Sequence, residues 1–462
     1  MTETKSYFFC GIGGSGMLPL ACIVRAQGAE VAGSDRSLDQ GRTGDKFAFL
    51  EDRGIRLYPQ DGSGIVSPDQ LLVASAAIED TVPDVAAAKR VGAERITRAE
   101  LLARLLNAAP LSIAVAGTSG KSTVTGMIAW ILHRSGKDPT VMNGAVMKNF
   151  VSDETPFASA LAGPGDVFVS EVDESDGSIA LYRPTVAVLN NVTLDHKGLD
   201  ELRGLFLDFA RRAGTVIVNL DDPEARALAG QLPGFVGYSL DDAKADYRAS
   251  EIVEAPLAIS FSVAHRGEAP VPVHLQVPGR HNVANALAAL AAAGAAGVPL
   301  AEAAEALAGF TGLRRRFELV GTRNGVSVID DFGHNPDKIA ATLKTLHAFP
   351  GRLLLFFQPH GYGPLRTMGR ELIGTFAGEM GADDVLVMPD PVYYGGTVDR
   401  SVGSGDIVAA IAAAGRRAEH VPERAAGGRR LAELAREGDR IVIMGARDDT
   451  LPAFARDVLG SL

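Results

Sequence analysis

The chain has 462 residues, of which 46% are hydrophobic and 22% are charged. This composition is that of a folded globular protein, and at about 150 residues per domain the length predicts about three domains. The 45 basic and 56 acidic residues leave a net charge of -11, which excludes a strong overall attraction for nucleic acid or anionic lipid. The two cysteines are too few for a disulfide framework, and this indicates the reducing cytoplasm.

The distribution of polar and apolar residues predicts neither export nor membrane insertion. The first residues, Met1–Lys5, are polar and lead directly into an apolar run, so we expect no signal peptide. The longest apolar stretch, 283–298, is rich in alanine and is interrupted by Gly294 and Gly297. A membrane span needs about 20 strongly apolar residues, so we expect no span and no membrane partner.

Short β-branched or aliphatic runs alternate with longer stretches rich in alanine, leucine and arginine along the whole chain. This alternation predicts the α/β class, with parallel sheets and helical crossovers. The carboxyl ends of such strands are where ligands bind in open parallel sheets. The predicted strands are 6–10, 30–33, 71–74, 112–116, 167–170, 186–189, 216–219, 326–329, 353–357, 385–388 and 441–444.

Two changes in composition predict domain boundaries. A polar turn at 107–110 precedes a fresh strand, and a basic cluster at 309–316 follows an alanine-rich helix. Between 246 and 278, short alternating runs separated by Pro and Gly predict a small antiparallel insertion. The predicted domains are 1–108, 109–312 and 313–462.

A first glycine loop follows the first predicted strand and opens a helix, and Asp35 closes the next strand. Glycines allow backbone N–H groups to approach a pyrophosphate, and a helix N-terminus favours its charge. This reasoning does not separate NAD from another diphosphate such as a nucleotide sugar, and a tight turn without a ligand is the alternative. The candidate ligand-binding residues are Gly11, Gly13, Gly14, Ser15, Gly16 and Asp35.

A second glycine loop follows the strand 112–116 and precedes the helical stretch 124–132. Its N–H groups can surround phosphate oxygens, Lys121 can contact the terminal phosphates, and the Ser122 hydroxyl can bind Mg²⁺. The loop departs from the usual P-loop spacing, which would require glycine where Val115 stands. The candidate nucleotide-binding residues are Gly117, Thr118, Ser119, Gly120, Lys121, Ser122 and Thr123.

Acidic residues and a histidine follow the next two predicted strands. Glu171 stands at the end of the strand 167–170, where a carboxylate can hold Mg²⁺ against nucleotide phosphates, although a solvated acidic loop is the alternative. His196 follows the strand 186–189 and is either a second metal ligand, a phosphate contact or a structural histidine.

Two further groups are ambiguous by themselves. Asn282 and Asn285 are spaced by three at the start of the alanine-rich helix, so they share a face that can read an adenine edge or cap the helix. The cluster 314–316 at the domain junction can neutralise a phosphoryl group or form a solvated surface.

Taken together, these motifs resemble a known family. The stretches that carry the resemblance are 117–122, 171–176, 195–196, 279–285, 315–317 and 330–336. They occur in the order seen in the Mur ligases, the ATP-dependent amide ligases of peptidoglycan precursor synthesis, and the resemblance covers nearly the whole chain. The stretches 11–17, 75–78, 357–360 and 444–446 are most similar to the branch that joins L-alanine to UDP-N-acetylmuramate.

The resemblance implies three domains: a Rossmann-like N-terminal domain for the uridine nucleotide, a central P-loop-type ATPase domain and a mobile Rossmann-like C-terminal domain. It also implies the reaction. ATP phosphorylates the muramyl carboxylate, an amine of an amino acid or peptide attacks the acyl phosphate, and the tetrahedral intermediate collapses to amide and phosphate. ATP and Mg²⁺ are the implied cofactors. The metal and Lys121 would offset the negative charge that accumulates between the two anions.

The resemblance also assigns roles to residues of this chain. The implied catalytic residues are Lys121, Glu171, His196 and His334, and the implied metal ligands are Ser122, Glu171 and His196. Asn282 and Asn285 are implied to hold adenine, Asp331 the ribose and Arg316 the phosphates. The implied substrate-binding residues are those of the first glycine loop with Asp35, Ser75, His360 and Arg366.

The chain departs from the family pattern at three places, of which the third faces the acceptor end. Ser119 and Asn335 stand where this branch usually has histidine, and glycines at 361 and 363 stand where it has arginines. Only Arg366 remains nearby to bind an acceptor carboxylate. A related ligase with another acceptor, such as a peptide, or with another acid substrate is therefore the alternative. A nucleotide-binding protein without turnover and an NAD-dependent dehydrogenase are two further hypotheses.

Overall fold

The computed structural model describes residues 6–76, 78–193, 198–392, 399–446, 448 and 450–462. The chain forms two compact units, one of Met1–Val253, Ile259–Gln276 and His281–Thr311, the other of Glu254–Ala258, Val277–Arg280 and Gly312–Leu462. The first unit holds two sheets and the second holds one. Every strand predicted from the sequence is present, with ends that differ by at most two residues. The exact domain limits stay a prediction.

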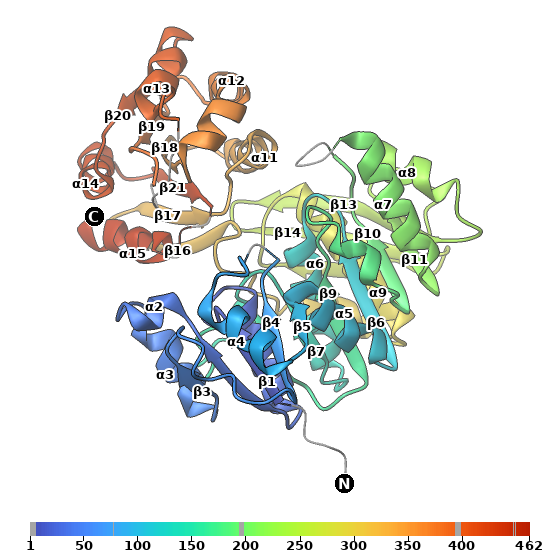
Figure 1. Ribbon diagram of the computed structural model, residues 1–462. Helices are drawn as coiled ribbons and strands as arrows, with labels where there is room; N and C mark the ends of the chain where they lie inside the picture. Colours follow the sequence, from blue (N-terminus) through green and yellow to red (C-terminus); the bar gives the residue numbers. More distant parts are fainter. Residues whose placement is uncertain (1–5, 77, 194–197, 393–398, 447, 449) are drawn as a thin grey trace. The chain divides into compact units, whose positions relative to one another are not determined.

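The N-terminal sheet of the first unit is parallel, in the order β3-β2-β1-β4-β5 (Figure 1). Alternate residues of β1 face opposite layers: Phe9 packs with α1, α3 and α5, whereas Phe8 packs with α4. This is the Rossmann-like arrangement that the sequence predicts. The elements are β1 (Ser6–Cys10), α1 (Met17–Ala26), β2 (Glu30–Ser34), α2 (Arg36–Asp39), α3 (Gly44–Asp52), β3 (Arg56–Tyr58), β4 (Gln70–Ala74), α4 (Pro83–Val91), β5 (Arg95–Thr97) and α5 (Arg98–Ala108).

The central sheet has ten strands in the order β15-β14-β13-β12-β11-β10-β6-β9-β7-β8. The antiparallel insertion predicted at 246–278 is present, but it extends this sheet, because β13 pairs in parallel with β12 through Tyr238 and Tyr247. The elements are β6 (Leu111–Ala116), α6 (Lys121–Arg134), β7 (Thr140–Met142), η1 (Lys148–Phe150), β8 (Ala160–Leu161), β9 (Val167–Glu171), η2 (Ser178–Leu181), β10 (Val186–Leu189), α7 (Leu199–Arg211), β11 (Thr215–Asn219), α8 (Pro223–Ala229), β12 (Val236–Ser239), β13 (Tyr247–Ala255), β14 (Ala258–His265), β15 (Val271–Leu275), α9 (Arg280–Ala295) and α10 (Leu300–Leu307).

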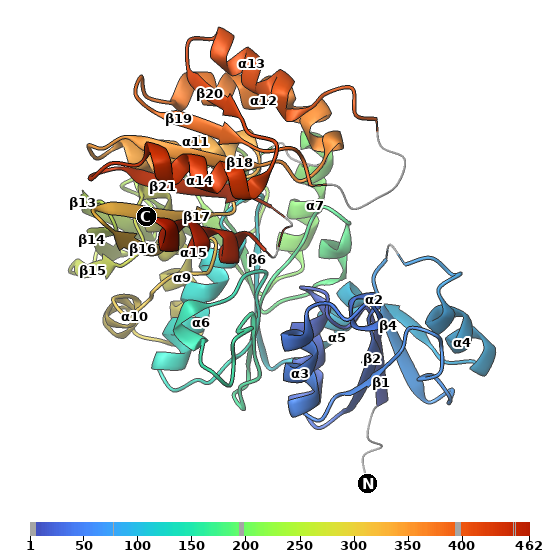
Figure 2. The same cartoon turned by 90° about the vertical axis from the view of Figure 1, so that its left-hand side faces the viewer.

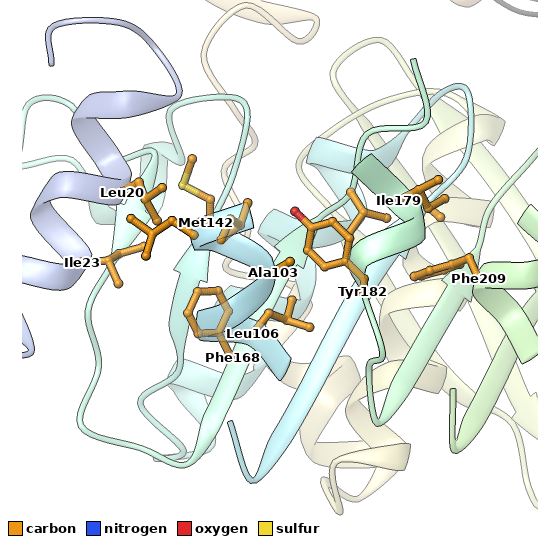
Figure 3. Close-up of a cluster of buried hydrophobic side chains, with 14 of the residues drawn as sticks. Leu20, Ile23, Ala103, Leu106, Met142, Phe168, Ile179, Tyr182 and Phe209 are labelled. Atoms are coloured by element: carbon orange, nitrogen blue, oxygen red, sulfur yellow. The ribbon is translucent and has the colours of Figure 1, made fainter. Parts of the chain in front are cut away.

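The two sheets of the first unit share one hydrophobic core. Leu20 and Ile23 of α1 lie beside Met142 of β7, and Leu106 of α5 lies beside Phe168 of β9 (Figure 3). Tyr182, just after η2, continues the same cluster. Burial of apolar surface on both sides of this seam is why the N-terminal and central parts form a single unit.

The alanine-rich segment 283–298 forms most of α9, and eleven of the sixteen residues of that helix are buried. Across the described part of the chain, no helix has both the length and the apolar character that a membrane span requires.

The sheet of the second unit has the order β16-β17-β21-β18-β19-β20 and is parallel except for β16. Helices α11, α12 and α13 cover one face of this sheet, and α14 and α15 cover the other (Figure 2). Leu355 of β18 belongs to the hydrophobic cluster on the first face, and its neighbour Phe356 belongs to the cluster on the second. Burial on both faces explains why β18, β19 and β21 are almost continuously apolar. The elements are β16 (Glu318–Arg323), β17 (Val326–Asp331), α11 (Pro336–His347), β18 (Leu353–Gln358), α12 (Tyr362–Glu379), β19 (Val385–Met388), α13 (Ser404–Ala413), β20 (Arg417–His420), α14 (Arg424–Leu434), β21 (Arg440–Gly445) and α15 (Leu451–Ser461).

The chain contains one tryptophan, Trp130, and it lies on α6, the helix that begins at Lys121. Its indole N–H donates to the Ala306 carbonyl at 2.8 Å, and its ring meets Phe150 edge to face. These contacts fix the far end of α6 against the region of α10.

Candidate active site

A cavity of about 540 Å³ lies in the first unit, between the two glycine loops. Its size is within the range of ligand sites. The predicted residues Ser75, Lys121 and Glu171 line it, together with part of the first glycine loop. The full lining is Cys10, Gly11, Gly14, Ser15, Gly16, Met17, Ser75, Ile78, Arg98, Leu102, Lys121, Met142, Asn143, Gly144, Glu171, Val172, Asp173, Ser178 and Tyr182.

The first glycine loop is held by Asp35, which accepts from the Gly13 N–H at 2.9 Å and from the Ser37 N–H at 2.8 Å. The Gly13 N–H is therefore already used inside the protein. In the described chain, the N–H groups of Ser15 and Gly16 have no hydrogen-bond acceptor, and both residues line the cavity. These two amides, with the following helix start, are the ones placed to meet an anion.

The buried carboxyl of Asp84 supports the first loop through Ser34. Ser34 accepts the N–H groups of Gly11 and Ile12 through its carbonyl, and its hydroxyl donates to Asp84. Asp84 also accepts from the Gly62 N–H at 3.0 Å. Burial raises the pKa of Asp84, although the hydrogen bond from Ser34 works against this shift.

Arg98 is a cavity residue that the sequence did not reveal. It is the first residue of α5, and a Cβ placed on Gly16 would lie 2.9 Å from its side chain, so the guanidinium stem packs against the first loop. Among the described residues, its guanidinium makes no hydrogen bond or salt bridge, while its charge helps to lower the pKa of Asp173. An arginine outside any motif carries no sequence signal, because only the fold brings it to the loop.

Two asparagine side chains brace the second glycine loop. The Asn191 amide accepts from the Ser119 N–H at 2.8 Å and donates to the Ser119 carbonyl at 3.0 Å, and Asn190 donates to the same carbonyl at 2.9 Å. The N–H groups from Gly120 to Thr123 then remain without backbone acceptors in the described chain, which leaves them for phosphate oxygens.

Lys121 is held by a buried acid, Glu174, which lies in the stretch 171–176 and to which the sequence assigns no role. Its ammonium donates to the Gly117 carbonyl at 2.7 Å and to both oxygens of Glu174, at 2.9 and 3.1 Å. Burial raises the pKa of Glu174, while the nearby Lys121 charge opposes that shift. The pair leaves the ammonium anchored at the edge of the cavity.

The Ser122 hydroxyl donates to Glu171 at 2.7 Å, so the structure brings together the two described residues predicted to bind Mg²⁺. Asn143 donates to the Ser122 carbonyl at 3.0 Å. Gly144 packs against the same carboxylate so tightly that a Cβ there would overlap Glu171 Oε1. Neither Asn143 nor Gly144 follows from a motif, because a different strand, β7, delivers them. The predicted His196 lies outside the described residues.

The predicted residues of the second unit surround the carboxyl end of β17. His334 donates from Nδ1 to the Phe332 carbonyl at 2.9 Å and meets the predicted His360 edge to face. Burial, followed by the charge of Lys338, lowers the pKa of His334 to about 3, so its imidazole is neutral and presents Nε2 as an acceptor. The Arg316 guanidinium lies 4.2 Å from the centre of the Phe332 ring.

Asp331, expected to hold a ribose, braces its own loop. Its carboxylate accepts from the N–H groups of Phe317 and Gly333 at 2.8 and 2.9 Å and from the Thr342 hydroxyl at 2.9 Å. The neighbouring Asp330 is buried, and burial raises its pKa to about 6 despite the opposing charge of Arg315. These contacts fix the segment that carries Arg316.

At the predicted acceptor end, Arg366 on α12 pairs with Asp399 at 2.9 Å, and both side chains are half exposed. Arg400 lies over the ring of Tyr362. Gly361 has a φ of +145°, a conformation that favours glycine. The single arginine that the sequence left for an acceptor carboxylate is thus already ion-paired.

Comparison with known proteins shows the family to which the chain belongs. Three family models match in succession: the Mur ligase family catalytic domain over 6–109, the Mur ligase middle domain over 115–293, and the Mur ligase glutamate ligase domain over 315–447. The UDP-N-acetylmuramate–L-alanine ligase of Sorangium cellulosum is 36% identical over 459 residues, covering 96% of this chain and 94% of that protein. The enzyme of the same name from Anaeromyxobacter dehalogenans is 35% identical and covers 96% and 95%.

Solved structures show the same architecture. The UDP-N-acetylmuramate–alanine ligase of Thermotoga maritima superposes with a TM-score of 0.77 at 26% identity, covering 98% of both chains. A murein peptide ligase from Psychrobacter arcticus has a TM-score of 0.69 at 26% identity, covering 99% of this chain and 98% of that one. With its two nucleotide loops, its three α/β domains and these relatives, the chain belongs to the Mur ligase family of ATP-dependent, ADP-forming ligases.

Proposed function

We propose that this ligase joins the amine of L-alanine to the carboxylate of UDP-N-acetylmuramate at the expense of ATP, a step in the synthesis of peptidoglycan precursors. The names of the relatives that cover nearly the whole chain support this choice of substrates. ATP is a cytoplasmic nucleotide, so the proposal locates the reaction in the cytoplasm.

The observation that carries the proposal is that residues of both loops line the same cavity. Arg98 and the amides of Ser15 and Gly16 lie at the first loop, and Lys121 and Glu171 line the cavity as well. In UDP-N-acetylmuramate the diphosphate joins the nucleoside to the sugar, and the sugar bears the carboxylate that reacts. The cavity therefore matches a molecule whose diphosphate meets the first loop while its carboxylate approaches the phosphate-binding loop.

The side chains present fit a magnesium ion. Ser122 and Glu171 offer a hydroxyl and a carboxylate from adjacent positions, which are the hard oxygen ligands that Mg²⁺ prefers, and Gly144 keeps the space beside them open. When bound there, the ion would neutralise negative charge between nucleotide and acid. His196 is proposed as a further ligand from the resemblance.

The chain's own groups support phosphoryl transfer to the carboxylate. The transferred group carries negative charge in the transition state, and the Lys121 ammonium is the cation at the loop that can offset it. Glu174 keeps that ammonium in one place, so its position need not be ordered during the reaction. We assign the adenine contact to Asn282 and Asn285, the ribose contact to Asp331 and a phosphate contact to Arg316.

The later steps need an acyl phosphate and an amine. The amine attacks the acyl carbon, forms the C–N bond and releases inorganic phosphate, with loss of one proton. His334, whose imidazole is neutral and presents Nε2, can accept a hydrogen bond from the attacking amine, and its low pKa makes it a weak base.

A second candidate is a ligase of the same class with a peptide acceptor. The ion pair of Arg366 with Asp399 favours it, because that guanidinium is not presented to a small amino-acid carboxylate. The likeness to a murein peptide ligase is consistent with it.

The deciding experiment offers purified protein UDP-N-acetylmuramate, ATP and Mg²⁺ with a panel of single amino acids and peptides, and detects phosphate and the product mass. The proposal predicts that L-alanine gives the highest kcat/KM. A higher value for a peptide would select the second candidate, and no amine-dependent phosphate release with any acceptor would contradict both.

A further inference from the structure

A continuous chain of polar side chains lies buried behind the second glycine loop. Tyr238 of β12 is fully buried, and Asn190, Asn285 and Asn282 are only 3%, 5% and 6% exposed. The Tyr238 hydroxyl donates to Asn190 Oδ1, Asn190 Nδ2 donates to Asn285 Oδ1 at 3.2 Å, and Asn285 Nδ2 donates to Asn282 Oδ1 at 3.0 Å. The chain thus runs from the central sheet to the first turns of α9.

These hydrogen bonds have a direction. A phenol has one proton, and a side-chain amide has one accepting end and one donating end. Once Tyr238 donates to Asn190, the nitrogen of Asn190 must face Asn285, and the same rule then orients Asn285 and Asn282 in turn. One buried hydroxyl, together with the Ser119 carbonyl that accepts from Asn190 Nδ2, therefore sets which atoms three amides present.

The same amides contact the glycine loop. Asn190 Nδ2 also donates to the Ser119 carbonyl at 2.9 Å. A Cβ on Gly120 would lie 2.5 Å from Asn190 Nδ2 and 2.6 Å from Asn285 Oδ1, so the backbone of the loop rests directly on these two side chains. A change in the orientation of Asn190 would therefore alter the position of the loop backbone and of the amides proposed to hold adenine.

We propose that Tyr238 is a positioning residue for the nucleotide, acting through Asn190 on the backbone of the second glycine loop and on the amides of Asn285 and Asn282. This inference rests on the proposed nucleotide site and extends it to two residues that the proposed function leaves unused. Tyr238 follows no phosphate-binding motif and reaches the site only because β12 lies beyond β10 and β11 in the sheet.

Tyr238→Phe tests the proposal, because it removes the hydroxyl and keeps the ring. The Asn190 oxygen would then be buried without a donor, and its amide would be held only through the nitrogen, by Ser119 and Asn285, so we expect its position to be less fixed and KM for ATP to rise by about tenfold. Lys121, Ser122 and Glu171 are untouched, so kcat should stay within about twofold. Preference for ATP over GTP should fall, because the amides lose their fixed orientation.

Tyr247→Phe is the matched control. Tyr247 is another buried tyrosine of the same sheet, but its ring stacks on His265 and its hydroxyl lies beside Gly294, far along α9 from Asn282. It should leave KM for ATP, kcat and base preference at wild-type values. A general loss of packing would instead affect both variants alike.

A second variant, Asn190→Ala, removes the link from the other side. If Tyr238 acts through Asn190, the double variant should show the same KM as Asn190→Ala alone. The dissociation constant of a non-hydrolysable ATP analogue should change in parallel in all these variants, and it is measured without turnover.

Three results would overturn the inference: unchanged ATP and analogue binding in Tyr238→Phe, effects of the two substitutions that add, or a lower melting temperature with unchanged KM. Wild-type protein that binds the analogue but releases no phosphate would refute the proposed function, while the binding comparison would still decide the role of Tyr238.

Discussion

The two glycine loops of the first unit begin alike and are held differently. Each follows a parallel strand and precedes a helix, yet a carboxyl supports the first loop through Ser34 and Asp84, whereas asparagine amides and Tyr238 support the second. The first loop faces the guanidinium of Arg98, which has no hydrogen-bond or salt-bridge partner in the described structure, while the second carries a lysine already paired with Glu174. Loops of similar sequence can therefore be held by different side chains and can carry different cations. The residues that hold a loop contribute to its chemistry together with the loop motif itself.

The largest expected effect comes from Lys121→Ala in the second loop. Loss of the cation that offsets phosphoryl charge should lower kcat by about a hundredfold or more. Amine-dependent phosphate release measures it, with the exposed Lys244→Ala as control. Activity close to wild type would mean that the phosphoryl group is stabilised elsewhere.

Gly144→Ala should have the next largest effect, because the added Cβ would displace the Glu171 carboxylate. We expect kcat to fall by about tenfold and half-saturation to require more Mg²⁺. Titration of activity with Mg²⁺ measures both. The control is Gly204→Ala in α7, where a Cβ meets nothing within 4 Å. An unchanged Mg²⁺ dependence would argue against Glu171 as a ligand.

Arg98→Ala should separate the loops. Loss of its charge should raise KM for the nucleotide sugar by about tenfold, because a charge-assisted contact to the diphosphate is lost. KM for ATP should stay unchanged. The control is Arg104→Ala on the same helix, whose partner Glu94 is exposed. An equal rise of both KM values would show that Arg98 supports the fold or both ligands.

The smallest expected effect is a pH dependence of protein stability that arises from Asp84, the carboxyl that supports the first loop. Since the pKa of Asp84 is raised in the folded chain, its folded form favours the proton, and stability is lost as pH rises through that pKa. Wild-type protein should therefore lose stability relative to Asp84→Asn as pH rises from about 4, the ordinary pKa of an aspartic acid, through the raised pKa of Asp84. Melting curves should show this as a change of about 2 °C in the difference between the two proteins. A constant difference would mean that Asp84 does not titrate in that range.

The sequence was sufficient for what local pattern and strand order determine. Glycine loops at strand ends, and the rule that neighbouring parallel strands end at one edge, are enough to bring Ser122 and Glu171 together. Alternating apolar and polar residues predicted the antiparallel insertion, but they did not predict its pairing with β12. That pairing depends on which strand of the central sheet has an unpaired edge.

The missing parts of the site share a physical reason. Arg98, Gly144 and Tyr238 lie outside every motif and meet the loops only through sheet order and helix packing. Glu174 is one of several acids in a short acidic segment, and nothing in their order says which of them turns inward to Lys121. A single sequence gives no signal for such long-range choices.

Trp130 on α6 gives the wild-type protein a fluorescence probe without any substitution. As the sole tryptophan of the chain, Trp130 reports without interference from another indole, and it is on the same rigid helix whose first residue is Lys121. We therefore expect nucleotide binding at the second loop to change the ultraviolet emission of the unlabelled wild-type enzyme, so that binding can be followed before any bond is made.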